Sequence, residues 1–141
     1  MKQVFKFLVL PLLFMGILSC RAQMVQTVTD AKKLEINENQ FIGKPLSDLF
    51  KEIKPEIKRV NVSPGGGETN SFFDFYFLSN EEYYKNRGEG KEPMGIRVYT
   101  KEIIPWYTSN RPKEDWRKWN SDDIKTYGNL TVVAIRVFGK N

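Results

Sequence analysis

The residue types that most often carry enzymatic chemistry are scarce in this chain. Its 141 residues include no histidine and a single cysteine, Cys20. Without histidine the chain cannot form a His-based catalytic triad or a zinc site of the HExxH type. A single cysteine can form neither an internal disulfide nor a cysteine-rich metal site. The sequence therefore predicts no metal site and no cofactor.

Two arrangements of side chains could still support hydrolysis. Adjacent carboxylates occur three times, at 81–82, 114–115 and 122–123, but adjacent residues seldom face one another across a cleft, as acid/base catalysis requires. Ser47 and Lys51 are four residues apart, which could place them on one face of a helix. A catalytic lysine must be desolvated, whereas Lys51 lies off the apolar stripe of its segment. We therefore expect no enzyme and keep a hydrolase with a carboxylate or Ser–Lys site as the alternative.

An aromatic and basic cluster is the strongest candidate for a binding surface. All three tryptophans of the chain fall within 14 residues. Tryptophan, tyrosine and arginine are enriched at binding hot spots because each combines a large contact area with a polar group. The other interpretation is that one or two tryptophans fill the end of a sheet and the arginines stack on them. The cluster consists of Trp106, Tyr107, Arg111, Trp116, Arg117 and Trp119.

The first twenty residues have the pattern of an export signal. Lys2 and Lys6 form a basic start, and residues 7–18 are apolar except for Pro11 and Gly16. This order is typical of a secretory signal peptide. Only 14 uncharged residues separate Lys6 from Arg21, whereas a bilayer-spanning helix needs about 20. The pattern favours export over a permanent transmembrane helix.

The end of this segment is similar to a known processing site. The residues Ile17, Leu18, Ser19 and Cys20 resemble the lipobox of bacterial lipoproteins, in which a small residue precedes the cysteine that receives the lipid. The resemblance implies a mature protein that begins at Cys20 and carries acyl chains such as palmitate. Several chains give stable membrane anchoring. Arg21 is not the aspartate that retains lipoproteins in the inner membrane, so the resemblance implies the outer membrane, facing the periplasm or the cell surface.

Ordinary signal cleavage after Ala22 is the alternative, because Cys20 and Ala22 also form an A-x-A-like site. It would give a soluble periplasmic or secreted protein. Cleavage before Cys20 removes the two lysines of residues 1–19 and leaves 20 basic and 17 acidic residues, a net charge of +3. A charge this small argues against nucleic-acid binding, which needs a concentrated basic face.

The mature chain divides into a tether and one domain. Residues 20–33 are polar after the anchor and predict a lipidated N-terminus with a tether. In residues 45–54, Leu46, Leu49, Phe50 and Ile53 fall on one helical stripe, between Pro45 and Pro55. A shorter helical turn is expected at 37–42. These two elements would form an N-terminal helical unit.

Alternating apolar residues predict the strands. Strands are expected at 57–62, 71–78, 95–100 and 130–138, and the 71–78 strand should be central because both of its faces are largely apolar. In the last strand, Thr131, Val133, Ile135 and Val137 should share one face. Helical segments are expected from a Ser79–Glu82 capping box to 86, at 112–119, and at 121–127 with a Ser N-cap.

These expectations combine into one protein class. The fold class is α+β, with a short N-terminal helical unit packed on an antiparallel sheet of three to five strands in a single domain, 34–141. We expect a membrane-anchored, exported binding or accessory module in the cell envelope, with a protein or cell-wall partner. An inhibitor or immunity protein that blocks an exported enzyme or toxin is a specific version. The alternative is an envelope hydrolase.

Overall fold

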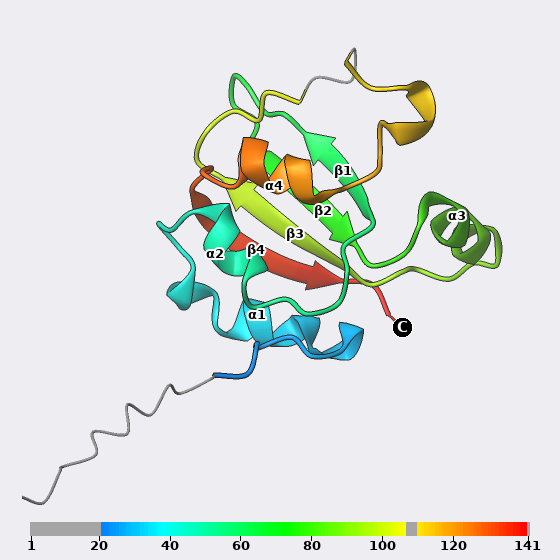
Figure 1. Ribbon diagram of the computed structural model, residues 1–141, viewed down its shortest axis with the longest axis horizontal. Helices are drawn as coiled ribbons and strands as arrows, with labels where there is room; N and C mark the ends of the chain where they lie inside the picture. Colours follow the sequence, from blue (N-terminus) through cyan, green and yellow to red (C-terminus); the bar gives the residue numbers. More distant parts are fainter. Residues whose placement is uncertain (1–20, 107–109, 141) are drawn as a thin grey trace, which may run out of the picture.

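The computed structural model describes residues 21–106 and 110–140 (Figure 1). The expected signal segment, Cys20 and Tyr107 lie outside the described residues. The domain is α+β, as predicted, and its helical unit packs on a four-stranded antiparallel sheet. No helix within the described ranges is both long and apolar enough to span a bilayer.

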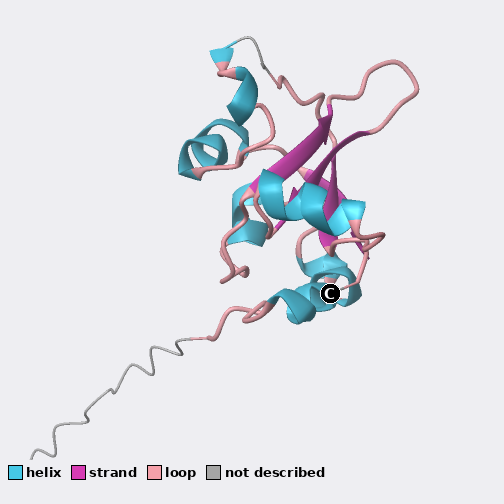
Figure 2. Ribbon diagram, turned by 90° about the vertical axis from the view of Figure 1, so that its right-hand side faces the viewer, coloured by secondary structure: helices cyan, strands magenta, loops and turns pink. Residues whose placement is uncertain are grey.

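The sheet has the strand order β1-β2-β3-β4, with every neighbouring pair antiparallel. β1 covers Arg59–Ser63, β2 Ser71–Tyr76, β3 Gly95–Thr100 and β4 Val132–Phe138. β2 is an internal strand, as its two apolar faces predicted. Figure 2 shows the sheet from the side and makes its strong twist visible.

The inner face of the sheet carries the hydrophobic core. Phe73 and Phe75 of β2 lie opposite Val98 and Ile96 of β3, and all four side chains are buried. The alternation of β3 is therefore as predicted, with Arg97 on the opposite face. Burial of this many large apolar side chains is the main force that stabilises the domain.

Helices cover the inner face (Figure 1). α2 spans Leu46–Phe50 and α4 spans Ser121–Tyr127. The apolar stripe of the 45–54 segment does pack into the core, but the helix is shorter than predicted and ends at Phe50. The expected 37–42 and 112–119 helices are reduced to single 3-10 turns, η2 at Glu38–Gln40 and η4 at Lys113–Asp115.

The expected N-cap of α4 is also corrected. Asn120, not Ser121, is the N-cap, because its side chain accepts hydrogen bonds from the N–H groups of Asp122 and Asp123. α3, Asn80–Gly88, begins with the predicted capping box: Ser79 N–H donates to Glu82 and Glu82 N–H donates to the Ser79 hydroxyl. Local side-chain chemistry therefore located both helix starts to within one residue.

The tether predicted to reach residue 33 is wrong over most of its length. Val25 is fully buried, and its backbone is hydrogen-bonded to the segment that follows α2. Val25 N–H donates to Glu52 O, and Lys54 N–H donates to Val25 O. The 3-10 helix η1, Val28–Ala31, and α1, Lys32–Ile36, follow directly. The folded part therefore begins about ten residues before the predicted boundary.

A β-bulge changes the predicted face of β4. Tyr99 pairs with Ala134, but the next residue, Thr100, pairs with Val132, so Val133 has no partner in β3. The extra residue shifts the alternation. Val132 and Ile135 are therefore both buried, while Val133 is 43% exposed. The prediction that Val133 shares the face of Ile135 is wrong.

The free edge of β4 is covered by carboxylates from the N-terminal helices. Glu38 accepts a hydrogen bond from the backbone N–H of Ile135, at 3.0 Å, and forms an ion pair with Arg136, at 2.8 Å. Glu35 of α1 accepts from the N–H of Val137, at 3.4 Å. The hydrogen bond from Ile135 N–H lowers the pKa of Glu38, and the contact with Arg136 lowers it further, while partial desolvation acts in the opposite direction. Side chains thus occupy donors that an edge strand normally leaves open.

α3 lies beyond the end of the sheet at which β2 and β4 finish (Figure 1), and none of its own residues is buried. Tyr83 of α3 makes two contacts with the sheet. The guanidinium carbon of Arg59 on β1, a residue only 1% exposed, lies 3.7 Å from its ring centroid, and the ring centroid of Tyr76 on β2 lies 4.9 Å from it. The Nε and Nη1 atoms of Arg59 have no hydrogen-bond partner in the described chain. Tyr83 therefore joins α3 to the sheet through both a cation–π contact and an aromatic contact.

Candidate functional site

The segment that carries the predicted cluster lies along the β1 edge of the sheet, on the side away from the start of the described chain (Figure 1). Trp119 belongs to the core: it is 7% exposed, and its ring centroid is 4.9 Å from that of Phe75 and 5.5 Å from that of Phe50. The strand β1 holds the segment in place, because Val60 N–H donates to Arg117 O and Trp119 N–H donates to Lys58 O.

Trp106 and Arg111 complete this inner part of the cluster. Trp106 is half-buried, and the Arg111 guanidinium carbon lies 4.2 Å from its ring centroid. Arg111 also forms a bidentate ion pair with Asp123 of α4, whose side chain is buried. The interpretation that tryptophans fill the end of the sheet and an arginine stacks on them therefore holds for Trp106, Arg111 and Trp119.

Trp116 and Arg117 are the members that face solvent. Trp116 is 40% exposed and donates its indole N–H to Arg111 O, at 3.1 Å. Arg117 is exposed and donates to the side-chain oxygen of Asn61 on β1. A hollow of about 210 Å³ lies between these side chains and the edge of β1. It is lined by Val60, Asn61, Val62, Trp106, Trp116 and Arg117.

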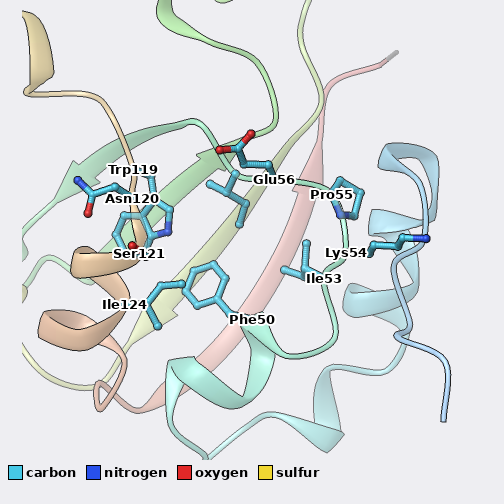
Figure 3. Close-up of a pocket in the computed structure, with 10 residues that line it drawn as sticks. Phe50, Ile53, Lys54, Pro55, Glu56, Trp119, Asn120, Ser121 and Ile124 are labelled. Carbon is cyan, nitrogen blue, oxygen red and sulfur yellow. The ribbon is translucent and has the colours of Figure 1, made fainter. Parts of the chain in front are cut away.

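A groove of about 280 Å³ adjoins Trp119 between α2 and α4 (Figure 3). Its walls are mainly apolar, with Phe50 and Ile124 on facing elements. Trp119 lines the groove, and its indole nitrogen is buried without a hydrogen-bond partner in the described chain. Glu56 lies at the rim (Figure 3). The groove therefore combines an apolar wall with one carboxylate.

A more polar hollow of about 540 Å³ shares Glu56, Trp119 and Asn120 with the groove. Lys118 lines it and pairs with Asp115, and this hydrogen bond, together with the charge of Asp115, raises the pKa of Lys118. Three concave surfaces thus surround residues 111–121. Together they offer hydrogen-bond donors, both signs of charge and apolar walls to a partner.

The groups considered for catalysis have other contacts. Lys51 is well exposed and its ammonium pairs with Asp48, at 2.8 Å, not with Ser47. Asp122 is exposed and pairs with Lys125, whose hydrogen bond and charge lower the pKa of Asp122. No group of three His, Cys, Asp or Glu side chains in residues 21–106 and 110–140 is placed to hold a metal ion.

Sequence reasoning missed part of this site. Phe50, Ile124 and Glu56 line the groove, yet nothing in their local sequence marks them as binding residues. The outer face of the sheet was also missed: Arg97 forms a bidentate ion pair with Asp74, at 2.7 and 2.9 Å, and stacks on Phe72. An arginine opposite an acid in adjacent strands is a pairing that sequence shows only once the register is known.

A comparison of the chain with protein-family models, curated proteins and solved structures finds no match.

Proposed function

We propose that this protein is an exported lipoprotein, anchored at Cys20, that acts as a non-enzymatic binding or accessory module of the cell envelope. The observation that carries the proposal is the concave surface around residues 111–121, where Trp116 and Arg117 remain exposed beside three hollows. The partner is a protein, and an exported enzyme or toxin that the module inhibits is the specific version.

The exposed residues suit a protein interface. Trp116 offers a large ring whose polar group is already satisfied by Arg111 O, so burial against a partner costs no hydrogen bond. The hollow beside it is of a size to receive a partner side chain, and Arg117 at its border can donate to a partner acceptor. Interface hot spots typically combine an aromatic anchor, an arginine and a pocket.

Anchoring at Cys20 would direct this surface away from the membrane. Val25 is in the core, and the five residue steps from Cys20 to Val25 span at most about 18 Å. The domain would therefore be held close to the bilayer by its N-terminal side. In Figure 1 the described chain begins at the bottom, while the 3-10 turn η4, just before Trp116, lies at the top.

Photo-crosslinking in living cells tests the partner site. A photoreactive phenylalanine analogue at Trp116 is expected to trap one defined protein, and Trp116→Ala should abolish co-purification of that protein. The matched control is the same analogue at Ile36, which is 80% exposed and lies on α1. Equal adducts at Trp116 and Ile36, or no adduct at Trp116, would contradict the proposed surface.

Anchoring has its own test. The Cys20→Ala variant should accumulate as the uncleaved precursor and lose the mass of the attached lipid, because the thiol that carries the lipid is gone. If membrane fractionation and mature mass are the same for the variant and the wild type, ordinary cleavage after Ala22 is the correct alternative.

A further inference from the structure

A second cavity lies away from the tryptophan cluster, between α3, the loop that follows it and the N-terminal turn η1. Its volume is about 780 Å³, within the range of sites for small ligands. Phe77 and Met94, both nearly fully buried, form its apolar interior together with Val28 and Leu78. In Figure 1 the blue N-terminal turn lies beside the C-terminal end of the chain at this position.

Two lysine side chains line the opening of this cavity. Lys91 and Lys140 line it, and Glu92 is the only acid among its lining residues within the described chain. The ammonium of Lys91 also pairs with Glu89, at 2.5 Å. Lys140 is held at the opening because its backbone N–H donates to Glu92 O, at 2.8 Å. An apolar interior below two lysines is complementary to an amphiphile with a negative headgroup.

We propose that this cavity binds a long-chain fatty acid, with the acyl chain against Phe77 and Met94 and the carboxylate at Lys91 and Lys140. One chain and one carboxylate match one apolar cavity with lysines at one opening. The site is separate from residues 111–121, so it does not depend on the proposed partner surface. Its side of the domain is the side that carries the N-terminus, and an anchored protein would hold it near a membrane that supplies such ligands.

Photolabelling tests the site on the complete protein, purified from membranes and placed in phosphatidylcholine vesicles. The probe is palmitic acid with a diazirine on its chain. Label is expected on the peptides that contain residues 77–78 and 90–94, and an excess of unlabelled palmitic acid should remove it. Label that is spread evenly over the surface, is confined to residues 21–24, or resists competition would overturn the proposal. So would labelling of these peptides by a phosphatidylcholine probe but not by the fatty acid.

Two variants test the interior and the opening separately. Val28→Trp fills the cavity from a partly exposed position and should reduce labelling at least tenfold, whereas Ile36→Trp should not change it. The double variant Lys91→Glu with Lys140→Glu replaces exposed side chains and is expected to fold. It should raise the palmitic acid concentration needed for half-maximal competition by about two- to thirtyfold, the range for two exposed ion pairs. Unchanged competition in this variant, or an equal change in Lys85→Glu with Lys113→Glu, would refute the role of the two lysines. Trp116→Ala should leave all of these results unchanged.

Discussion

The buried ion pair between Arg111 and Asp123 gives the sharpest prediction for stability. Asp123→Asn keeps the shape of the side chain but removes the charge that faces the Arg111 guanidinium. The carboxylate of Asp123 also accepts the backbone N–H of Asn120, at 2.9 Å, as part of the capping box of α4. The variant therefore weakens two contacts that position α4 and the segment before Trp116.

The magnitude follows from burial. Breaking a buried ion pair by removing one charge costs about 3–5 kcal/mol, because the other charge is left without compensation. Arg111 keeps 18% of its side-chain surface exposed, and an asparagine oxygen can still accept one hydrogen bond, so the lower end applies. We expect Asp123→Asn to lower the free energy of unfolding by about 3 kcal/mol, and Tm by about 10 °C for a domain of this size.

Urea denaturation followed by circular dichroism and by tryptophan fluorescence measures this change. The matched control is Asp122→Asn, because Asp122 is adjacent in sequence but its ion pair with Lys125 is at the surface. Its free energy of unfolding should lie within about 0.5 kcal/mol of that of the wild type. A double-mutant cycle uses Arg111→Met as the second change. The losses of unfolding free energy in the two single variants should sum to more than the loss in the double variant, by more than about 1 kcal/mol. Additive costs, or a loss below about 0.5 kcal/mol in Asp123→Asn, would refute the reasoning.

Three further predictions concern other parts of the fold. The lowered pKa of Glu38 stabilises the folded state at pH values above the ordinary glutamate pKa, and this stability is lost as the pH falls through the lowered pKa. Glu38→Gln should therefore reduce the loss of stability at acid pH in a plot of unfolding free energy against pH. An unchanged loss would refute the role of Glu38 at the edge of β4. Gly95→Ala places a methyl group 2.6 Å from the Phe138 ring and should cost about 1–3 kcal/mol in thermal unfolding, whereas Gly88→Ala has open space and should cost nothing. Arg59→Ala removes the cation–π contact with Tyr83 and should speed amide hydrogen exchange in α3 but not in β2; equal protection of α3 in both proteins would show that another contact holds it.

The class of the fold was predictable because its elements carry strong local signals. The strict alternation of β3 predicted its bounds, Gly95–Thr100, to the residue. The Ser79–Glu82 pair predicted the start of α3 from side-chain chemistry alone. In both cases the information lies within about ten residues of chain, which is the range that periodicity and capping patterns can report.

The errors arose where distant contacts decide the structure. Val25 and Ala31 are isolated apolar residues in a polar segment, and their burial depends on contacts with the chain after α2 and with the sheet. The bulge at Val133 shifts one strand by one residue, which alternation in that strand cannot reveal. Helix length in the 45–54 segment was overestimated for a similar reason, since the apolar stripe continues through a turn that packs in the core without being helical.

The candidate site was predictable in position but not in detail. Composition identified the residues from Trp106 to Trp119 as a cluster, yet composition cannot separate Trp119, which pairs with β1 and is buried, from Trp116, which is exposed. That distinction depends on pairing between segments about 60 residues apart. The hydrophobic groove beside Trp119 likewise needs Phe50 and Ile124 from separate helices.

The carboxylates that cover the edge of β4 also bear on how copies of the protein meet. An open edge strand can accept a strand from a neighbouring molecule and so begin aggregation. On the proposed lipid anchoring, the molecules would diffuse in one membrane plane and meet far more often than the same number in solution. Glu35 and Glu38 accept the N–H groups of Val137 and Ile135, so these two donors are not open to a strand from a neighbouring molecule. On the same proposal, a crowded population would remain as separate molecules, each with its tryptophan surface free.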